Sequence, residues 1–315
     1  MTNKNPKRPP TSYRAPRSNG SSADVAPRRR GLLGNFLAPR PRVESSMPKI
    51  PTSLWRGFIA VVSSPVLVLS VPLILLVEWA AAVALGFQGP FSVMASALAL
   101  PPVGTVFDGG LATSLFGAQA GLVMLVAFVV LRAVILGFLT AAAVQKLDED
   151  HVSAAALKRG VRIIPTTLAV GITDMFILTI SSILVQILGG AIGLLIQIAA
   201  LIFALYLLVF APVIAASEHR GMPESLGRSI RAGRMPGAGN LAFAAIYVIP
   251  AIVVSVIPGL PGKLVGVNPS VGSWAFAIVV NLIQVVFLTT FAFRYLSIAD
   301  EVPEAPARER PARRR

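Results

Sequence analysis

The chain has 315 residues, of which 55% are hydrophobic and only 13% are charged, and its mean hydropathy is +0.74. This composition excludes an ordinary soluble globular domain and predicts an all-α integral membrane protein. The absence of cysteine excludes disulfides, thiolate metal sites and cysteine nucleophiles within the chain. The formal net charge of +14 comes mainly from two basic tails.

Residues 1–53 form a cationic tail with nine prolines and eleven Lys or Arg residues against two acids. Such a segment cannot bury a core, so we expect it to be disordered. The arginines at 28–30 precede an apolar run of only seven residues, which is too short for an export signal. We expect the tail to bind anionic headgroups at the cytoplasmic face or to serve only as a tether that sets the topology.

Residues 54–298 contain six apolar stretches that approach the roughly 20 residues a bilayer core requires. The predicted spans are 65–86, 118–144, 163–188, 191–216, 241–257 and 273–293. The third and fourth form one run that Gly189-Gly190 divides. The sequence therefore predicts six transmembrane helices in three helical hairpins, followed by a second tail over residues 299–315.

Lys and Arg concentrate in the loops on one side of these spans, and the opposite loops hold only Lys263. The positive-inside rule then places both termini in the cytoplasm. Frequent Arg, Ala, Gly and Pro suggest a GC-rich bacterial genome, so we predict a multi-pass protein of the bacterial inner membrane.

One five-residue pattern occurs three times, each time before an outward span. The copies, called pentads below, are Leu54-Trp55-Arg56-Gly57-Phe58, Leu157-Lys158-Arg159-Gly160-Val161 and Leu226-Gly227-Arg228-Ser229-Ile230. A proline follows each copy, and we expect each pentad to form a short interfacial helix whose arginine contacts lipid phosphates. Three copies indicate a threefold structural repeat; because their spacing is unequal and such residues often flank spans, coincidence is the alternative.

The predicted first external loop, residues 87–117, carries Asp108 as its only charge. It either caps the outer surface or re-enters between the helices, where its backbone would need cover from protein or water.

Three ionisable residues fall inside predicted spans: Glu78, Arg132 and Asp174. At a rise of about 1.5 Å per residue, Arg132 and Asp174 both lie near the midplane. A charge there costs at least roughly 2.5–3.5 kcal/mol, so we predict an Arg132–Asp174 ion pair with Glu78 as second partner. Asn281 and Gln284 share a face of span six and would extend this polar group, which is either structural or a binding or proton-relay site.

The motifs of enzymes are absent from the sequence. It has no phosphate-binding glycine loop, no His-Glu-x-x-His and no Gly-x-Ser-x-Gly. His151 and His219 lie beside acids at nearly matching places, but two histidines without further ligands favour solvated loops over a shared metal site. We therefore expect no catalytic residue, metal or cofactor, and no nucleic-acid partner, because no stacking aromatics accompany the basic tails.

Residues 207–218 read Leu-Leu-Val-Phe-Ala-Pro-Val-Ile-Ala-Ala-Ser-Glu, and residues 222–229 read Met-Pro-Glu-Ser-Leu-Gly-Arg-Ser. This pattern resembles uncharacterised bacterial six-helix membrane proteins similar to the membrane domain attached to some glycerophosphodiester phosphodiesterases. Ser225 replaces the alanine usual there. The resemblance implies a fold and a location but no reaction, because no catalytic domain accompanies it here.

The sequence thus predicts a non-enzymatic accessory or scaffolding membrane protein that binds lipids or partner membrane proteins. The alternative is a small transporter or lipid-handling protein with a polar midplane cavity around Arg132 and Asp174.

Overall fold

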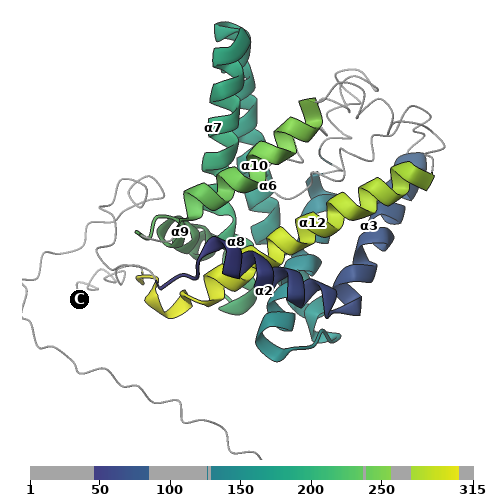
Figure 1. Ribbon diagram of the computed structural model, residues 1–315. Coiled ribbons are helices and arrows are strands. Elements are labelled where there is room, and N and C mark those ends of the chain that lie inside the picture. Colours follow the sequence, from purple (N-terminus) through teal and green to yellow (C-terminus); the bar gives the residue numbers. More distant parts are fainter. Residues whose placement is uncertain (1–45, 85–125, 127–128, 237–238, 257–270, 305–315) are drawn as a thin grey trace, which may run out of the picture.

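The computed structural model of the chain describes residues 46–84, 126, 129–236, 239–256 and 271–304 (Figure 1). Over these residues the regular structure is helical, as predicted, and no strand occurs. The helices are α2 (Ile50–Val62), α3 (Pro65–Ala84), Val129–Glu149, α6 (Ala155–Leu188), α7 (Gly190–Leu208), α8 (Phe210–Ser217), α9 (Met222–Gly233), α10 (Asn240–Val256) and α12 (Val271–Leu296), followed by the 3-10 turn Ala299–Glu301. The predicted loop 87–117 and most of both tails lie outside the described residues.

Three of the described helices are long and apolar enough to cross a membrane: Val129–Glu149, α6 and Ile198–Ser217, which combines parts of α7 and α8. A fourth results if α2 and α3, bent by 80° at their junction, count as one span. The three helices overlap predicted spans two, three and four, although their ends differ by up to eight residues where both ends are described. Helices also lie at the other predicted positions, as α3, α10 and α12, but the count of six spans and their layout as three hairpins remain predictions.

Two breaks have the local causes that the sequence predicts. α6 ends at Leu188 and α7 begins at Gly190, because Gly189 adopts a φ of 65°, which is open to glycine but strained for other residues. Pro65 starts α3 directly after α2, and proline disfavours helical backbone at the residue before it. Figure 1 shows α6 and α7 side by side, extending beyond the other helices.

The second pentad does not form the separate interfacial helix that we predicted. It lies in the first turns of α6, which runs without interruption from Ala155 to Leu188 although Pro165 is inside it. Proline removes one helical hydrogen bond, but packing keeps the helix continuous: the side-chain hydroxyl of Thr167 donates to Ala133 O at 2.7 Å, which fastens α6 to Val129–Glu149 just beyond the proline. The first and third pentads do lie in separate short helices, α2 and α9.

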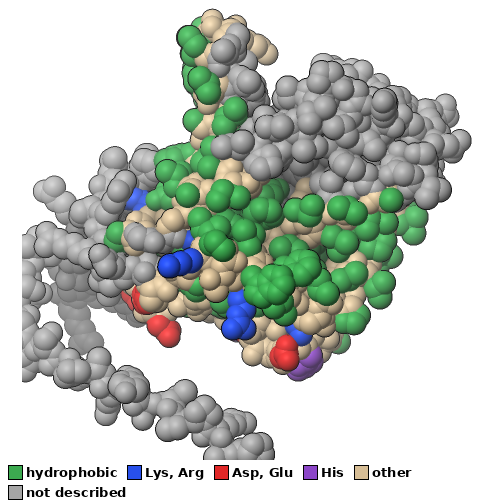
Figure 2. Space-filling view, in the orientation of Figure 1, with side chains coloured by type: hydrophobic (Ala, Val, Ile, Leu, Met, Phe, Trp, Pro, Cys, Tyr) green, Lys and Arg blue, Asp and Glu red, His purple; other side chains and the backbone are tan. Residues whose placement is uncertain are grey.

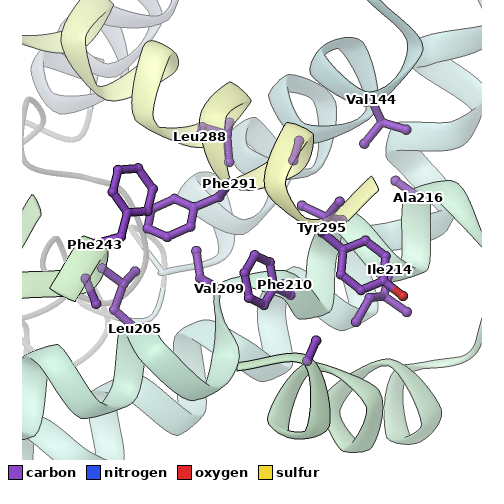
Figure 3. Close-up of a cluster of buried hydrophobic side chains, with 14 of the residues drawn as sticks. Val144, Leu205, Val209, Phe210, Ile214, Ala216, Phe243, Leu288, Phe291 and Tyr295 are labelled. Carbon is purple, nitrogen blue, oxygen red and sulfur yellow. The ribbon is translucent and has the colours of Figure 1, made fainter. Parts of the chain in front are cut away.

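The largest hydrophobic core lies where α8, α10 and α12 meet (Figure 3). Phe243 contacts Phe291 with ring centroids 4.6 Å apart, and Phe210 contacts Tyr295 at 5.8 Å. This aromatic cluster joins α12 to α8 and α10, the helices on either side of α9, which carries the third pentad.

Three helices pack around one point in the same register. They are Val129–Glu149, α7–α8 and α12, called return helices below because each is predicted to cross back to the cytoplasmic side. Adding 69 to a residue number of the first return helix gives the equivalent residue of the second. Adding 83 to that number gives the equivalent residue of the third. In this register Leu136, Leu205 and Leu288 are equivalent, and all three line one closed cavity of about 10 Å³. Thr140 is the one polar residue in its lining, and its volume is about what a single water needs, so the centre is tightly packed and mostly apolar.

Candidate functional site

The fourth residue of each pentad is small because it touches a return helix. A Cβ on Gly57 would lie 2.1 Å from Oγ1 of Thr290 in α12, and one on Gly160 would lie 3.1 Å from Cα of Phe138. In the third pentad, Ser229 Oγ donates to Leu207 O at 2.6 Å.

The three contacted residues, Thr290, Phe138 and Leu207, are equivalent in the register of the return helices. These matching contacts favour a structural repeat over coincidence. The repeat also closes across the chain, since α2, near the beginning, packs on α12, near the end (Figure 1).

Eleven residues after each contacted residue comes an acid: Glu149 at the end of its helix, Glu218 directly after α8, and Glu301 in the 3-10 turn after α12. Glu149 pairs with Arg159 at 3.5 Å, and Glu218 pairs with Arg228 at 3.0 Å, so the second and third pentad arginines each bind the preceding acid.

The residues after the first two of these acids, Asp150 and His219, share a left-handed backbone with φ of 59° and 58°. The same turn therefore leads from the return helix to the pentad in both units. Glu301 differs, because it accepts hydrogen bonds from the backbone N–H of Ser46, at 3.0 Å, and from the hydroxyl of the same residue.

Arg228 is the centre of a buried polar network at this end of the molecule. Its side chain is only 5% exposed. It donates to Tyr295 Oη at 2.8 Å, to Val302 O at 3.1 Å and to Ala299 O at 2.6 Å. The predicted role of Arg228 in binding lipid phosphate is therefore wrong, because its donors are used inside the protein.

The segment after α12 is held by further arginines of α9 and of the turn that precedes it. Arg220 donates to Glu304 Oε1 at 2.7 Å, Arg228 Nη1 reaches the same oxygen at 3.0 Å, and Arg231 donates to Pro303 O at 3.0 Å. The hydrogen bond from Arg220 lowers the pKa of the Glu304 carboxyl below its ordinary value. Beside these residues lies an open pocket of about 490 Å³, lined by Glu218, Arg220, Arg228 and residues 299–304.

Another buried arginine, Arg294, is not among the residues that the sequence predicts for a site. It donates to Pro48 O at 2.9 Å and to Asn240 Oδ1 at 3.1 Å, and its guanidinium lies 5.2 Å from the centre of the Phe243 ring. Arg294, in α12, thus connects the residues just before α2 with the first residue of α10. Its only signal in the sequence is its place as the last charge of an apolar helix, which would equally fit a residue at the membrane surface.

The other two predicted lipid-contacting arginines differ from each other. Arg159 is 19% exposed and bound to Glu149. Arg56 is exposed on α2 beside Trp55 and Phe58. Among the described residues, no acid lies within ion-pair distance of Arg56.

The structure does not bring Arg132 and Asp174 together. Both are buried, but neither carboxylate oxygen of Asp174 has a hydrogen-bond partner among the described residues. Thr167 lies opposite Ala133, so Asp174, seven residues further along α6, is roughly 9 Å away from Arg132 along the helix axis. The depth prediction failed because α6 begins eight residues before the predicted span and the preceding helix ends five residues after its own.

The remaining predicted midplane residues do not assemble into one site. Gln284 is buried and its amide nitrogen has no hydrogen-bond partner among the described residues, whereas Asn281 is half-buried. In the register of the return helices, Gln284 is equivalent to Arg132 and Leu201, so it belongs to the layer next to the three leucines. Glu78 lies in α3, and its side chain is outside the described residues.

Within the described residues, no three His, Asp or Glu side chains gather as they would around a metal ion. His151 is exposed, with Nδ1 2.9 Å from Glu149 O, and His219 is exposed in the equivalent turn. The two histidines thus lie in separate turns of two units rather than at a shared centre.

No family model, curated protein or solved structure matches the chain. The resemblance to the membrane domain of glycerophosphodiester phosphodiesterases therefore stays a prediction.

Proposed function

We propose that this chain is a multi-pass bacterial inner-membrane protein of a non-enzymatic accessory or scaffolding type, which binds lipids or partner membrane proteins and has both termini in the cytoplasm. The observation that carries the proposal is the small, mostly apolar centre, where Leu136, Leu205 and Leu288 meet around about 10 Å³ with Thr140 as the one polar lining residue. A protein that moves polar solutes needs a wider or polar path there in some state. The packed centre supports a framework instead.

The arrangement of the three units that carry the pentads gives further support. Each pentad is held on a return helix by a close contact, and two of the three pentad arginines are used in internal ion pairs. These features hold helices together and leave the outward faces available to lipid or protein. The non-enzymatic part of the proposal rests on the absence of catalytic motifs in the sequence.

Extraction of the protein from its native membrane in polymer nanodiscs, followed by lipid mass spectrometry, tests the proposal. We expect anionic phospholipids to be enriched at least twofold over the bulk membrane, because basic residues border the described cytoplasmic-side helices. A lipid composition equal to that of the bulk membrane, with no copurified membrane protein, would contradict it.

The second candidate is a small transporter or lipid-handling protein. One observation favours it: the carboxylate of Asp174 is fully buried and lacks a hydrogen-bond partner among the described residues. An ionisable group inside a membrane is by default a candidate functional site. A transporter needs a hydrated path to this group, so an Asp174→Cys variant would react with a membrane-impermeant thiol reagent. Absence of reaction in intact and in opened vesicles would exclude the candidate.

A further inference from the structure

α2 presents two different faces. Ser53, Gly57 and Ala60 are buried against the rest of the protein, whereas Trp55, Phe58 and Val62 are 61%, 44% and 59% exposed. Ile59 is exposed as well, and these four side chains are called the outer face of α2 below. Figure 2 shows hydrophobic side chains gathered over α2, with Lys or Arg side chains at the border.

The outer face combines aromatic and cationic groups. The rings of Trp55 and Phe58 stack with centroids 5.7 Å apart. Arg56 and Lys49 are exposed beside them, and no acid occurs between Met47 and Glu78 in the sequence. Aromatic rings with basic side chains are typical of helices that lie at the boundary between headgroups and acyl chains.

Arg56 differs from the other two pentad arginines in being available to an external anion. Arg159 binds Glu149 and Arg228 binds Glu218, but the equivalent acid of the first unit, Glu301, is occupied by Ser46. Arg56 has no acid of the described residues within ion-pair distance. The same position in the repeat is therefore structural in two units and open to an external anion in the third.

We propose that the outer face of α2 binds an anionic phospholipid, with Arg56 on the headgroup phosphate and Trp55 and Phe58 against the glycerol and upper acyl chain. The inference rests on the proposed function and names its lipid class and contact residue. The 80° bend between α2 and α3 supports a lipid as the occupant. It places an exposed amphipathic helix at the end of an apolar one, where a membrane surface would meet it.

The test uses Trp55 as its own reporter. The chain has three tryptophans, so a full-length protein with Trp79→Phe and Trp274→Phe reports from Trp55 alone. Reconstituted into phosphatidylcholine vesicles, it is titrated with brominated phosphatidylglycerol or with brominated phosphatidylcholine, and quenching gives the relative affinity of the two lipids. We expect phosphatidylglycerol to be preferred. Arg56→Gln should reduce the preference about fivefold, the effect of about 1 kcal/mol per basic residue near the surface.

Matched variants separate headgroup contact from general charge and from folding. Arg162→Gln removes another exposed arginine, in α6, and should leave the preference unchanged. Arg56→Lys should retain most of the preference for phosphatidylglycerol. All variants should unfold at the temperature of the parent protein, because the side chains of Arg56 and Arg162 are both exposed. An unchanged preference in Arg56→Gln overturns the inference but leaves the proposed function intact if anionic lipids are still enriched. Absence of Trp55 quenching by either lipid, together with no enrichment in nanodiscs, contradicts both.

Discussion

Gly57 lies against Thr290 so closely that a methyl group on Gly57 would meet Oγ1 at 2.1 Å and the Thr290 backbone nitrogen at 3.0 Å. This contact joins α2, where the described chain begins, to α12, where it nearly ends. It is the counterpart of the contacts at Gly160 and Ser229, and so it completes the repeat across the two ends of the chain.

Gly57→Ala should therefore destabilise the protein by about 1–3 kcal/mol, because the backbone of Thr290 cannot move aside as a flexible side chain would. Unfolding in mixed detergent micelles measures the effect. Gly171→Ala is the control, since its methyl group would meet only Val129 Cγ1 at 3.6 Å, an ordinary contact. Equal stability of Gly57→Ala and Gly171→Ala would show that α2 does not pack on α12 as described.

Arg228 and Arg159 occupy equivalent positions but should differ in importance. Arg228→Gln removes one of the two cations that pair with Glu218, which is only 17% exposed, and removes hydrogen bonds to Tyr295, Ala299 and Val302. We expect a loss of about 2–3 kcal/mol, below the full value for a buried pair because Glu218 keeps Arg220. Arg159→Gln breaks one partly exposed pair and should cost under about 1 kcal/mol. The same unfolding assay compares them, and similar losses would argue against a special role of the Arg228 network.

The attachment of residues 302–304 should depend on pH through Glu304. Its pKa is lowered in the folded protein, chiefly by the hydrogen bond from Arg220, so the carboxylate stabilises the attached state above the ordinary carboxyl pKa. That stabilisation is lost as the pH falls through the lower folded pKa. A spin label on Pro303→Cys, the only cysteine then present, should become more mobile below about pH 4.

Arg220→Gln provides the control for this pH dependence. It removes the main cause of the lowered pKa, so the mobility transition should move to higher pH. A label whose mobility is the same from pH 7 to pH 3, with or without Arg220, would show that Glu304 does not hold the segment.

Arg132 and Asp174 should act independently. Because neither oxygen of Asp174 has a hydrogen-bond partner among the described residues, the effects of Arg132→Gln and Asp174→Asn on unfolding should add within about 0.5 kcal/mol. The pair Glu218→Gln and Arg228→Gln, joined at 3.0 Å, should instead couple by more than about 1 kcal/mol. Strong coupling between Arg132 and Asp174 would contradict this expectation and support the ion pair that the sequence predicts.

The sequence predicts well what local chemistry determines. Long apolar runs indicate the helices Val129–Glu149, α6 and α7–α8, and Gly189 indicates the break between the last two, because only one residue type fits that turn readily. The pentads also predict three equivalent positions. Their small fourth residue indicates a close helix contact, although the sequence alone does not show which residue is contacted.

The sequence predicts poorly what depends on partners from distant segments. Arg228 matches Arg56 and Arg159 in pattern, but its burial depends on Tyr295 and on carbonyl groups after α12. The Arg132–Asp174 pair is predicted from span ends that composition alone places. Errors of five and eight residues at those ends shift depth by roughly 8–12 Å, more than an ion pair tolerates.

Three return helices enclose a closed, mostly apolar centre. Because the chain lacks cysteine, Leu136→Cys, Leu205→Cys and Leu288→Cys each supply a single thiol there, and His151→Cys, at a side chain 66% exposed in a turn between two helices, supplies an accessible reference. The direct measurement is the rate at which a membrane-impermeant maleimide labels each thiol in opened membrane vesicles. We expect the three central thiols to react at least a hundredfold more slowly than His151→Cys. Labelling of the central thiols at a rate close to that of the reference would contradict a closed centre and show that water reaches it.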